Sequence, residues 1–118
     1  MNTVDSDRVL GYAALALVII GNTTGNLLLK LGASASSSQR LFGVVGWLTL
    51  AGVMSFAVGI LAYAWALKHI ELHSAQIVIS VQYVAVVLLA AFMLGERISL
   101  TQWCGMALIA MGIFICTR

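Results

Sequence analysis

The chain has 118 residues, of which 62% are hydrophobic and 8% are charged. Because soluble domains carry about 25% charged residues, this composition excludes a water-soluble globular domain. A helix needs about 20 apolar residues to cross ~30 Å of hydrocarbon. The charges leave room for four such helices, predicted at about residues 9–30, 41–67, 72–95 and 98–117. The predicted fold is a single all-α membrane domain over residues 1–118, with up-down helices joined as hairpins by short links.

The first predicted span carries a polar stripe. Asn22, Asn26 and Lys30 recur every four residues, so they lie on one face of a helix that runs from mid-membrane to one surface. A polar side chain in hydrocarbon needs a partner or an aqueous cavity. The stripe therefore indicates a site for a polar, anionic headgroup. The alternative is that the amides bond across helices and Lys30 only extends to the membrane surface.

The second predicted span has aromatic residues near both ends. Trp47 and Trp65 are typical of the aromatic belt at a membrane surface, whereas Tyr63 is either a belt residue or part of the binding site. The following link carries Lys68, His69, Glu71 and His73. Such a cluster resembles a metal or proton site, but on a surface turn it is more typical of solvated side chains, and we expect no metal there.

The third predicted span carries a second polar stripe. Gln76, Ser80 and Tyr83 share one helical face with His73, while Gln82 lies off that face and is expected to contact another helix or a partner chain. The two stripes are placed to meet. In the fourth span, Cys104 and Cys116 are too far apart along one helix to form a disulfide with each other, so we expect reduced packing residues.

Pairs of small residues recur at spacings that allow helices to approach closely. They serve packing within one chain or between two chains, and one sequence does not distinguish these uses. Four helices enclose little space, and many transporters assemble from two halves, so we expect a homodimer or a heterodimer with a paralogous small subunit. The pairs are Gly21 and Gly25, Ser55 and Gly59, and Gly105 and Gly112.

The loop charges do not fix an orientation. Four crossings place Arg8, Lys68 and Arg118 on one side and Lys30, Arg40 and Arg97 on the other. A Lys/Arg excess normally marks the cytoplasmic side. The tie leaves two interpretations open: insertion in both orientations, or a weak preference for cytoplasmic termini if Lys30 is counted with its helix.

Motifs for catalysis are missing from the sequence. It contains no phosphate loop, nucleophile triad or ligand cluster, so we expect neither an enzyme nor a cofactor, and no nucleic-acid partner. No Asp or Glu falls in mid-span either. Proton-driven antiport typically depends on an ionisable carboxyl group within the membrane, and this chain lacks one.

The chain resembles, over nearly its whole length, the four-helix small members of the drug/metabolite transporter superfamily, and three stretches carry the resemblance. They are GNLLLKLGA at the end of the first span, AYAWALKHIELHSAQIVIS across the second hairpin, and MLGERISLTQWCGMALIAMGIFI over the last turn and span. The third is the most specific. The resemblance implies a small half-transporter.

Within that superfamily, the chain departs from the small multidrug resistance exporters. Their membrane-embedded Glu lies eight residues before a Lys, and this chain has Asn22 in that place. Their third-helix Tyr and Trp fall near Gln76 and Ile79, and their Gly-x-Gly kink falls near Val81 and Tyr83. None of these hallmarks is present.

The chain is more similar to the aminoarabinose-phosphoundecaprenol flippase subunits. They share a fourth helix that begins Trp-Cys-Gly and the Gly-amide-Leu-x-x-Lys pattern, here Gly25, Asn26, Leu27 and Lys30. The resemblance implies movement of a polyprenyl-phosphate-linked sugar across the bacterial inner membrane by a pair of small subunits. The expected partner is then a membrane lipid or lipid-linked substrate. The candidate substrate-binding residues are Asn22, Asn26, Lys30, Tyr63, Gln76, Ser80 and Tyr83.

Two other functions remain open at the level of sequence. One is a small exporter of cations or metabolites, with Asn22 in place of the coupling Glu. The other is an accessory subunit that transports nothing and stabilises a larger membrane complex. A fixed anion in the path would repel an anionic headgroup, so the missing mid-span carboxylate favours the lipid-linked sugar.

Overall fold

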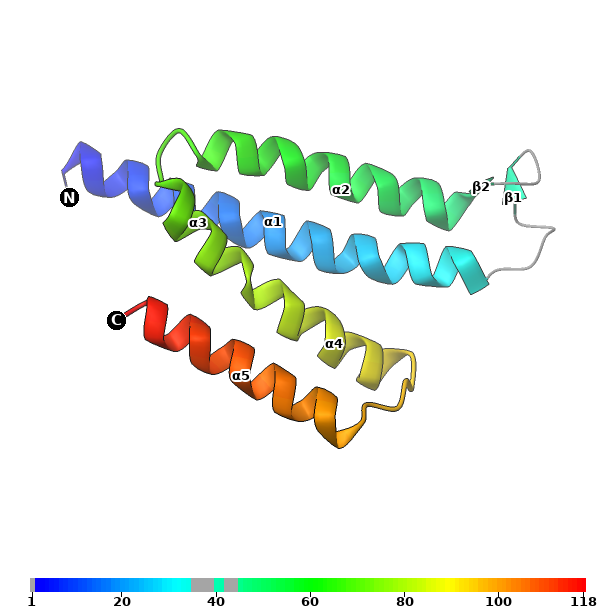
Figure 1. Ribbon diagram of the computed structural model, residues 1–118. Helices are drawn as coiled ribbons and strands as arrows, with labels where there is room; N and C mark the ends of the chain where they lie inside the picture. Colours follow the sequence, from blue (N-terminus) through cyan, green and yellow to red (C-terminus); the bar gives the residue numbers. More distant parts are fainter. Residues whose placement is uncertain (1, 35–39, 42–44) are drawn as a thin grey trace.

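The computed structural model describes residues 2–34, 40–41 and 45–118. These residues are almost all helical, which confirms the all-α prediction (Figure 1). Helices α1 and α2 lie side by side along their length, α3 continues into α4, and α5 runs back beside α4, so that both termini lie at the same end. The helices are α1 (Thr3–Ser34), α2 (Trp47–Ala66), α3 (Leu72–Ile79), α4 (Val81–Met93) and α5 (Leu100–Cys116).

Three helical segments qualify as membrane spans, and a shorter apolar helix follows them. The segments that are long and apolar enough to span a bilayer are α1, α2, and the combined α3 and α4 (Leu72–Met93). Helix α5 is also apolar but has 17 residues, which is ~25 Å of helix and lies at the short end of the usual range. The lengths and composition of these helices are those of a multi-pass membrane protein.

Two helices begin at places that the sequence did not indicate. Helix α1 begins at Thr3, so the polar residues in front of the predicted span are already helical. Helix α2 begins at Trp47 instead of residue 41, because an antiparallel pair of two-residue strands, β1 (Arg40–Leu41) and β2 (Val45–Gly46), precedes it. Residues 35–39 and 42–44 of the predicted link and span lie outside the described residues.

The third span is interrupted at Ser80, where α3 ends and α4 begins. The Ser80 hydroxyl donates to the carbonyl oxygen of Gln76 at 2.7 Å, and the Ser80 N–H donates to the same oxygen at 3.0 Å. Serine that bonds back to the preceding turn bends helices. The sequence suggested Ser80 as a member of a polar stripe, and the structure shows that its side chain also shapes the backbone.

A seam of small residues joins α1 to α2. A Cβ built on Gly25 would lie 2.9 Å from the Phe56 ring and 3.2 Å from the carbonyl oxygen of Gly52. The Ser55 hydroxyl donates to the carbonyl oxygen of Gly21 at 2.7 Å. Two of the predicted small-residue pairs therefore serve packing within the chain, because only residues without bulk allow the two backbones to approach this closely.

The small residues of α5 behave differently. A Cβ built on Gly105 or Gly112 would meet no neighbouring atom of the described residues within 4 Å. Met106 is the buried residue of this helix. The α5 face therefore has room for further packing that α1 and α2 lack.

The core lies near the end of the molecule that carries the termini. There α1 packs against the end of α2 and the start of α3, and Leu15 is completely buried. The Cα atoms extend over 54 × 36 × 19 Å, so the chain forms a thin slab with little interior. The core cluster is Leu15, Val18, Ala66, Ile70, Ala75 and Ile79.

Candidate functional site

A hydrogen bond between two side-chain amides joins α1 to α4. The Asn22 amide nitrogen donates to Gln82 Oε1 at 2.9 Å in a half-buried position. Asn26, one turn further along, donates to the carbonyl oxygen of Asn22 at 2.9 Å. The Asn26 bond ends on the Asn22 backbone, so Gln82 is the partner that holds the Asn22 side chain. Gln82 thus contacts another helix of the same chain, one of the two partners expected for it.

The Asn22–Gln82 pair provides a test of the packing between α1 and α4. Gln82→Leu removes the acceptor for the Asn22 amide, and we expect the free energy of unfolding to fall by about 1 kcal/mol. Unfolding in mixed micelles measures it. In a double-mutant cycle with Asn22→Leu, a coupling energy of about 0.6 kcal/mol is expected. Strictly additive effects would show that the contact contributes nothing.

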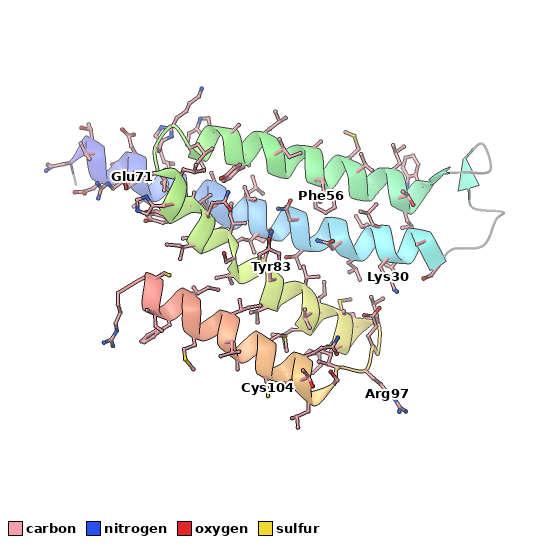
Figure 2. The ribbon with its side chains drawn as sticks, viewed as in Figure 1. Lys30, Phe56, Glu71, Tyr83, Arg97 and Cys104 are labelled. Carbon is pink, nitrogen blue, oxygen red and sulfur yellow. The ribbon has the colours of Figure 1, made fainter. Side chains whose placement is uncertain are left out.

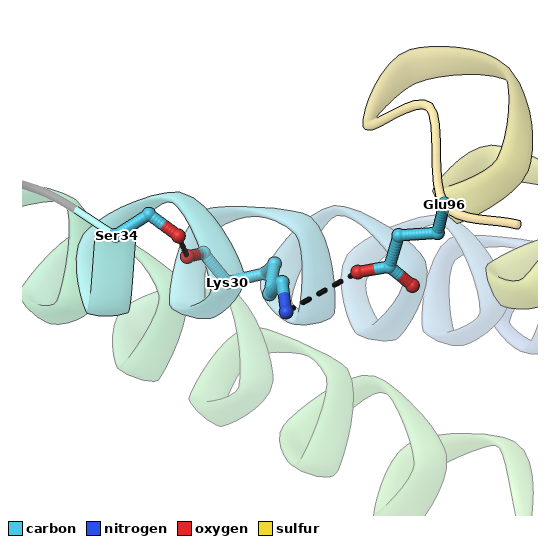
Figure 3. A network of polar contacts seen from close by, with 3 residues as sticks. All are labelled: Lys30, Ser34 and Glu96. Atoms are coloured by element: carbon cyan, nitrogen blue, oxygen red, sulfur yellow. Dashed lines mark hydrogen bonds and ion pairs between the residues drawn. The ribbon is translucent and has the colours of Figure 1, made fainter.

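At the end of the stripe, Lys30 forms an ion pair (Figure 3). Lys30 Nζ lies 3.2 Å from Glu96 Oε1, and the two side chains are 55% and 46% exposed. Exposed pairs of this kind contribute ~0–1 kcal/mol, so this one is easily exchanged for another partner. The sequence had placed Lys30 and Arg97 on one side of the membrane. The contact of Lys30 with the neighbouring Glu96 agrees with that sorting.

A turn at Gly95 brings the Glu96 side chain next to Lys30. Gly95 follows the end of α4 with a φ of 65°, the left-handed conformation that commonly ends helices and that glycine adopts without strain. The N–H of Glu96 then donates to the carbonyl oxygen of Ala90 at 3.3 Å, which folds the turn over the helix end. Sequence reasoning missed Glu96 as a site residue. Gly95, directly before it, was the feature of the sequence that could have indicated a tight turn at this position.

A cavity of about 260 Å³ lies between α1 and α4, and both members of the ion pair line it. The Thr23 hydroxyl oxygen is buried and has no hydrogen-bond partner within the described part of the chain. Buried hydroxyls are normally paired, so this oxygen lacks the partner that such a group usually has. The cavity is lined by Thr23, Asn26, Leu27, Lys30, Val86, Leu89, Ala90, Leu94 and Glu96.

The other predicted site residues lie in two further cavities. Tyr63, Gln76 and Asn22 line one of about 170 Å³, where Gln76 Nε2 donates to the Tyr63 hydroxyl at 2.6 Å. Ser80 and Tyr83 line another of about 490 Å³ between the third span and α5. The two predicted stripes therefore meet at Asn22 and Gln76, but they do not form one continuous surface.

The charged and histidine side chains that follow α2 lie at the surface of the molecule. His73 Nε2 lies 3.5 Å from Glu71 Oε2, and both side chains are strongly exposed. No group of three or more His, Cys, Asp or Glu side chains in the described ranges is arranged to hold a metal ion. Figure 2 shows Glu71 at the end of the molecule opposite to Lys30 and Arg97.

Comparison with known proteins identifies the family. The profile of the EamA-like transporter family matches residues 6–118. The chain belongs to this family. The match confirms the resemblance to the drug/metabolite transporter superfamily that the loop and helix motifs indicated. No solved structure matches the chain.

Several relatives of this EamA-like chain are named probable 4-amino-4-deoxy-L-arabinose-phosphoundecaprenol flippase subunit ArnE. The protein from Pectobacterium atrosepticum is 33% identical over 110 residues, which is 90% of this chain and 96% of the relative. The protein from Yersinia pestis is 31% identical over 107 residues, or 88% of this chain and 93% of the relative. The protein from Pseudomonas fluorescens is 32% identical over 87 residues, or 74% of each chain.

Proposed function

We propose that this chain is a subunit of a flippase that moves a polyprenyl-phosphate-linked sugar across the bacterial inner membrane. The observation that carries the proposal is the cavity between α1 and α4, which combines the Lys30–Glu96 ion pair, an amide and a hydroxyl without a partner among the described residues in a largely apolar lining. The similarity to the flippase subunits named above supports it. Transport of this kind makes and breaks no bonds, so no catalytic residue is needed.

The cavity residues match the chemistry of such a headgroup. A sugar phosphodiester presents one negative charge and several hydroxyls. Lys30 supplies the point charge for the phosphate, while Asn26 and Thr23 offer hydrogen bonds to the sugar. The volume of about 260 Å³ is slightly below the ~300 Å³ at which pockets for drug-sized ligands begin. It suits one sugar and its phosphate, and the lipid tail remains in the bilayer.

The remaining polar residues extend the proposed path. Asn22 lies between the cavity that holds Lys30 and the one that holds Tyr63 and Gln76. A headgroup that leaves the Lys30 cavity would meet these amides next. Ser80 and Tyr83, on the α5 side, provide further hydroxyls for the substrate or its carrier lipid.

We propose that the working unit is a dimer of this chain with itself or with a paralogous small subunit, in which the two protomers are inverted. The thin slab of helices and the open glycine face of α5 support this proposal, and the charge tie is compatible with inversion. Crosslinking in native membranes, combined with accessibility tags at both termini, tests it. A strictly monomeric chain that transports would contradict it.

The experiment that tests the function is a leaflet-accessibility assay. The chain, alone and with its paralogous subunit, is reconstituted in proteoliposomes that contain a labelled polyprenyl-phosphate sugar in one leaflet. We expect label to appear in the other leaflet faster than in protein-free vesicles. Rates equal to those of protein-free vesicles, from correctly inserted protein in both reconstitutions, would contradict the proposal.

A second expected result concerns drug export. Because Asn22 stands where the small multidrug exporters carry a Glu, and because it is paired with Gln82, the chain lacks a mid-membrane proton carrier. Cells that express it should gain no resistance to quaternary ammonium drugs, and the purified protein should release no protons when such a drug is added. Ethidium efflux driven by a proton gradient would contradict this expectation.

A further inference from the structure

The cavity between α1 and α4 presents two opposite charges, although a phosphodiester needs only the positive one. Lys30 Nζ and Glu96 Oε1 are 3.2 Å apart, and both residues line the same cavity. A carboxylate beside a phosphate site repels the phosphate unless something neutralises it. The pair therefore fits a headgroup that itself carries both signs.

Resting on the proposed function, we propose that Glu96 is the specificity-determining residue for a positively charged amine on the sugar, while Lys30 holds the phosphate. Such a headgroup is zwitterionic, like the amino-sugar phosphodiester in the names of the relatives from Pectobacterium atrosepticum and Yersinia pestis. In the empty protein the two side chains neutralise each other. When the headgroup binds, the phosphate takes the place of Glu96 beside Lys30, and the amine takes the place of Lys30 beside Glu96.

The geometry makes this exchange inexpensive. Both side chains are about half exposed, so water replaces part of the lost contact as they separate. The backbone of Glu96 is fixed by its hydrogen bond to Ala90 behind the Gly95 turn, so the carboxylate stays beside the cavity after it leaves Lys30. The backbone of Lys30 is part of α1, and its carbonyl oxygen accepts the Ser34 hydroxyl at 3.0 Å (Figure 3).

The opposite charges of Lys30 and Glu96 favour a zwitterionic headgroup over an anionic one. The ion pair has no net charge, and neither has an amino-sugar phosphodiester, so each ionic group keeps an opposite partner throughout. A neutral sugar phosphodiester would take Lys30 and leave Glu96 unpaired next to a second anion. That arrangement places two anions beside a single cation, which disfavours the neutral sugar even where both side chains are half exposed.

The alternative role for Glu96 is purely structural, as a clamp between α1 and the turn before α5. The two roles predict different outcomes. A clamp supports transport of any headgroup equally, so its loss lowers all rates by the same factor. A residue that recognises the amine changes the ratio between substrates that differ only in that group.

The test compares two probes in proteoliposomes: a polyprenyl-phosphate 4-amino sugar and its N-acetyl derivative, which keeps the phosphate and loses the positive charge. We expect the wild type to move the amine at least about fivefold faster, as one charge-assisted contact in a half-exposed site allows. Glu96→Gln should make the two rates equal within a factor of ~2, mainly by slowing the amine. Glu71→Gln, the same change in an exposed carboxylate at the far end of the molecule, should keep the wild-type ratio.

The outcomes separate this inference from the proposed function. Equal rates for both probes in the wild type would overturn the role of Glu96 and leave the flippase in place. A retained preference in Glu96→Gln, or a fall of both rates by one factor, would also overturn it. If wild-type protein moves neither probe, both the function and the inference fail. Insertion and assembly are measured in the same vesicles, and Glu96→Asp, which keeps the charge, should restore the preference.

Discussion

Replacing Lys30 with alanine is expected to abolish transport of the lipid-linked substrate while the protein still inserts and assembles. Lys30 is the cation that the structure places in the cavity between α1 and α4, and its loss leaves Glu96 facing the phosphate alone. Charge-assisted bonds to phosphate are among the stronger polar contacts in proteins, so a fall of at least about tenfold is expected. The rate at which labelled substrate reaches the opposite leaflet measures it.

Two variants serve as controls for this result. Lys30→Arg keeps the positive charge and should retain part of the activity. Lys68→Ala removes an exposed lysine at the other end of the molecule and should leave the rate unchanged. If Lys30 only anchors the helix at the membrane surface, alanine costs no more than a small shift in helix depth. A wild-type rate for Lys30→Ala would then remove the cation from the proposed site.

Replacing Gly25 with leucine should cause a large loss of stability. Its Cβ alone would lie 2.9 Å from the Phe56 ring and 3.2 Å from the carbonyl oxygen of Gly52, and the backbone oxygen has little room to move. Overpacking of this kind costs about 1–3 kcal/mol or more. The free energy of unfolding in mixed micelles, followed by tryptophan fluorescence, measures the loss.

Gly105→Leu is the matched control for this change. Both glycines lie inside helices, so leucine gains the same helix propensity at each, of about 1 kcal/mol. A Cβ on Gly105 would meet no neighbouring atom of the described residues within 4 Å. The difference between the two variants therefore isolates packing. Equal stabilities would show that α1 and α2 do not pack as closely as the structure indicates.

The distribution of charge was enough to predict four apolar helical segments in up-down order, although the third is divided into α3 and α4. A charged side chain is expensive in hydrocarbon, so its position bounds each span. The break at Ser80 was not predictable in this way. Serine in an apolar helix either faces a partner or bonds back to its own chain, and only the neighbouring helices decide between these.

The candidate site was predicted in part. Helical periodicity placed Asn22, Asn26 and Lys30 on one face, because that depends on local geometry alone. It did not identify the partner of each side chain. Gln82 lies off the predicted stripe and still reaches Asn22, and Glu96 reaches Lys30 from a turn far along the sequence. Such pairs depend on how helices are placed relative to one another, which periodicity does not encode.

The glycine seam between α1 and α2 has a consequence for the path of a lipid-linked substrate. While the headgroup crosses, the polyprenyl tail stays among the lipids, so the path must be a slot that opens sideways into the bilayer. The seam leaves no such slot, because the backbones of α1 and α2 are in contact through Gly21, Gly25 and Ser55. On its other side, α1 faces α4 across the cavity that Lys30 lines. For the proposed flippase, we therefore expect the lateral exit for the tail between α1 and α4, on the side of the chain where the proposed headgroup ligands are.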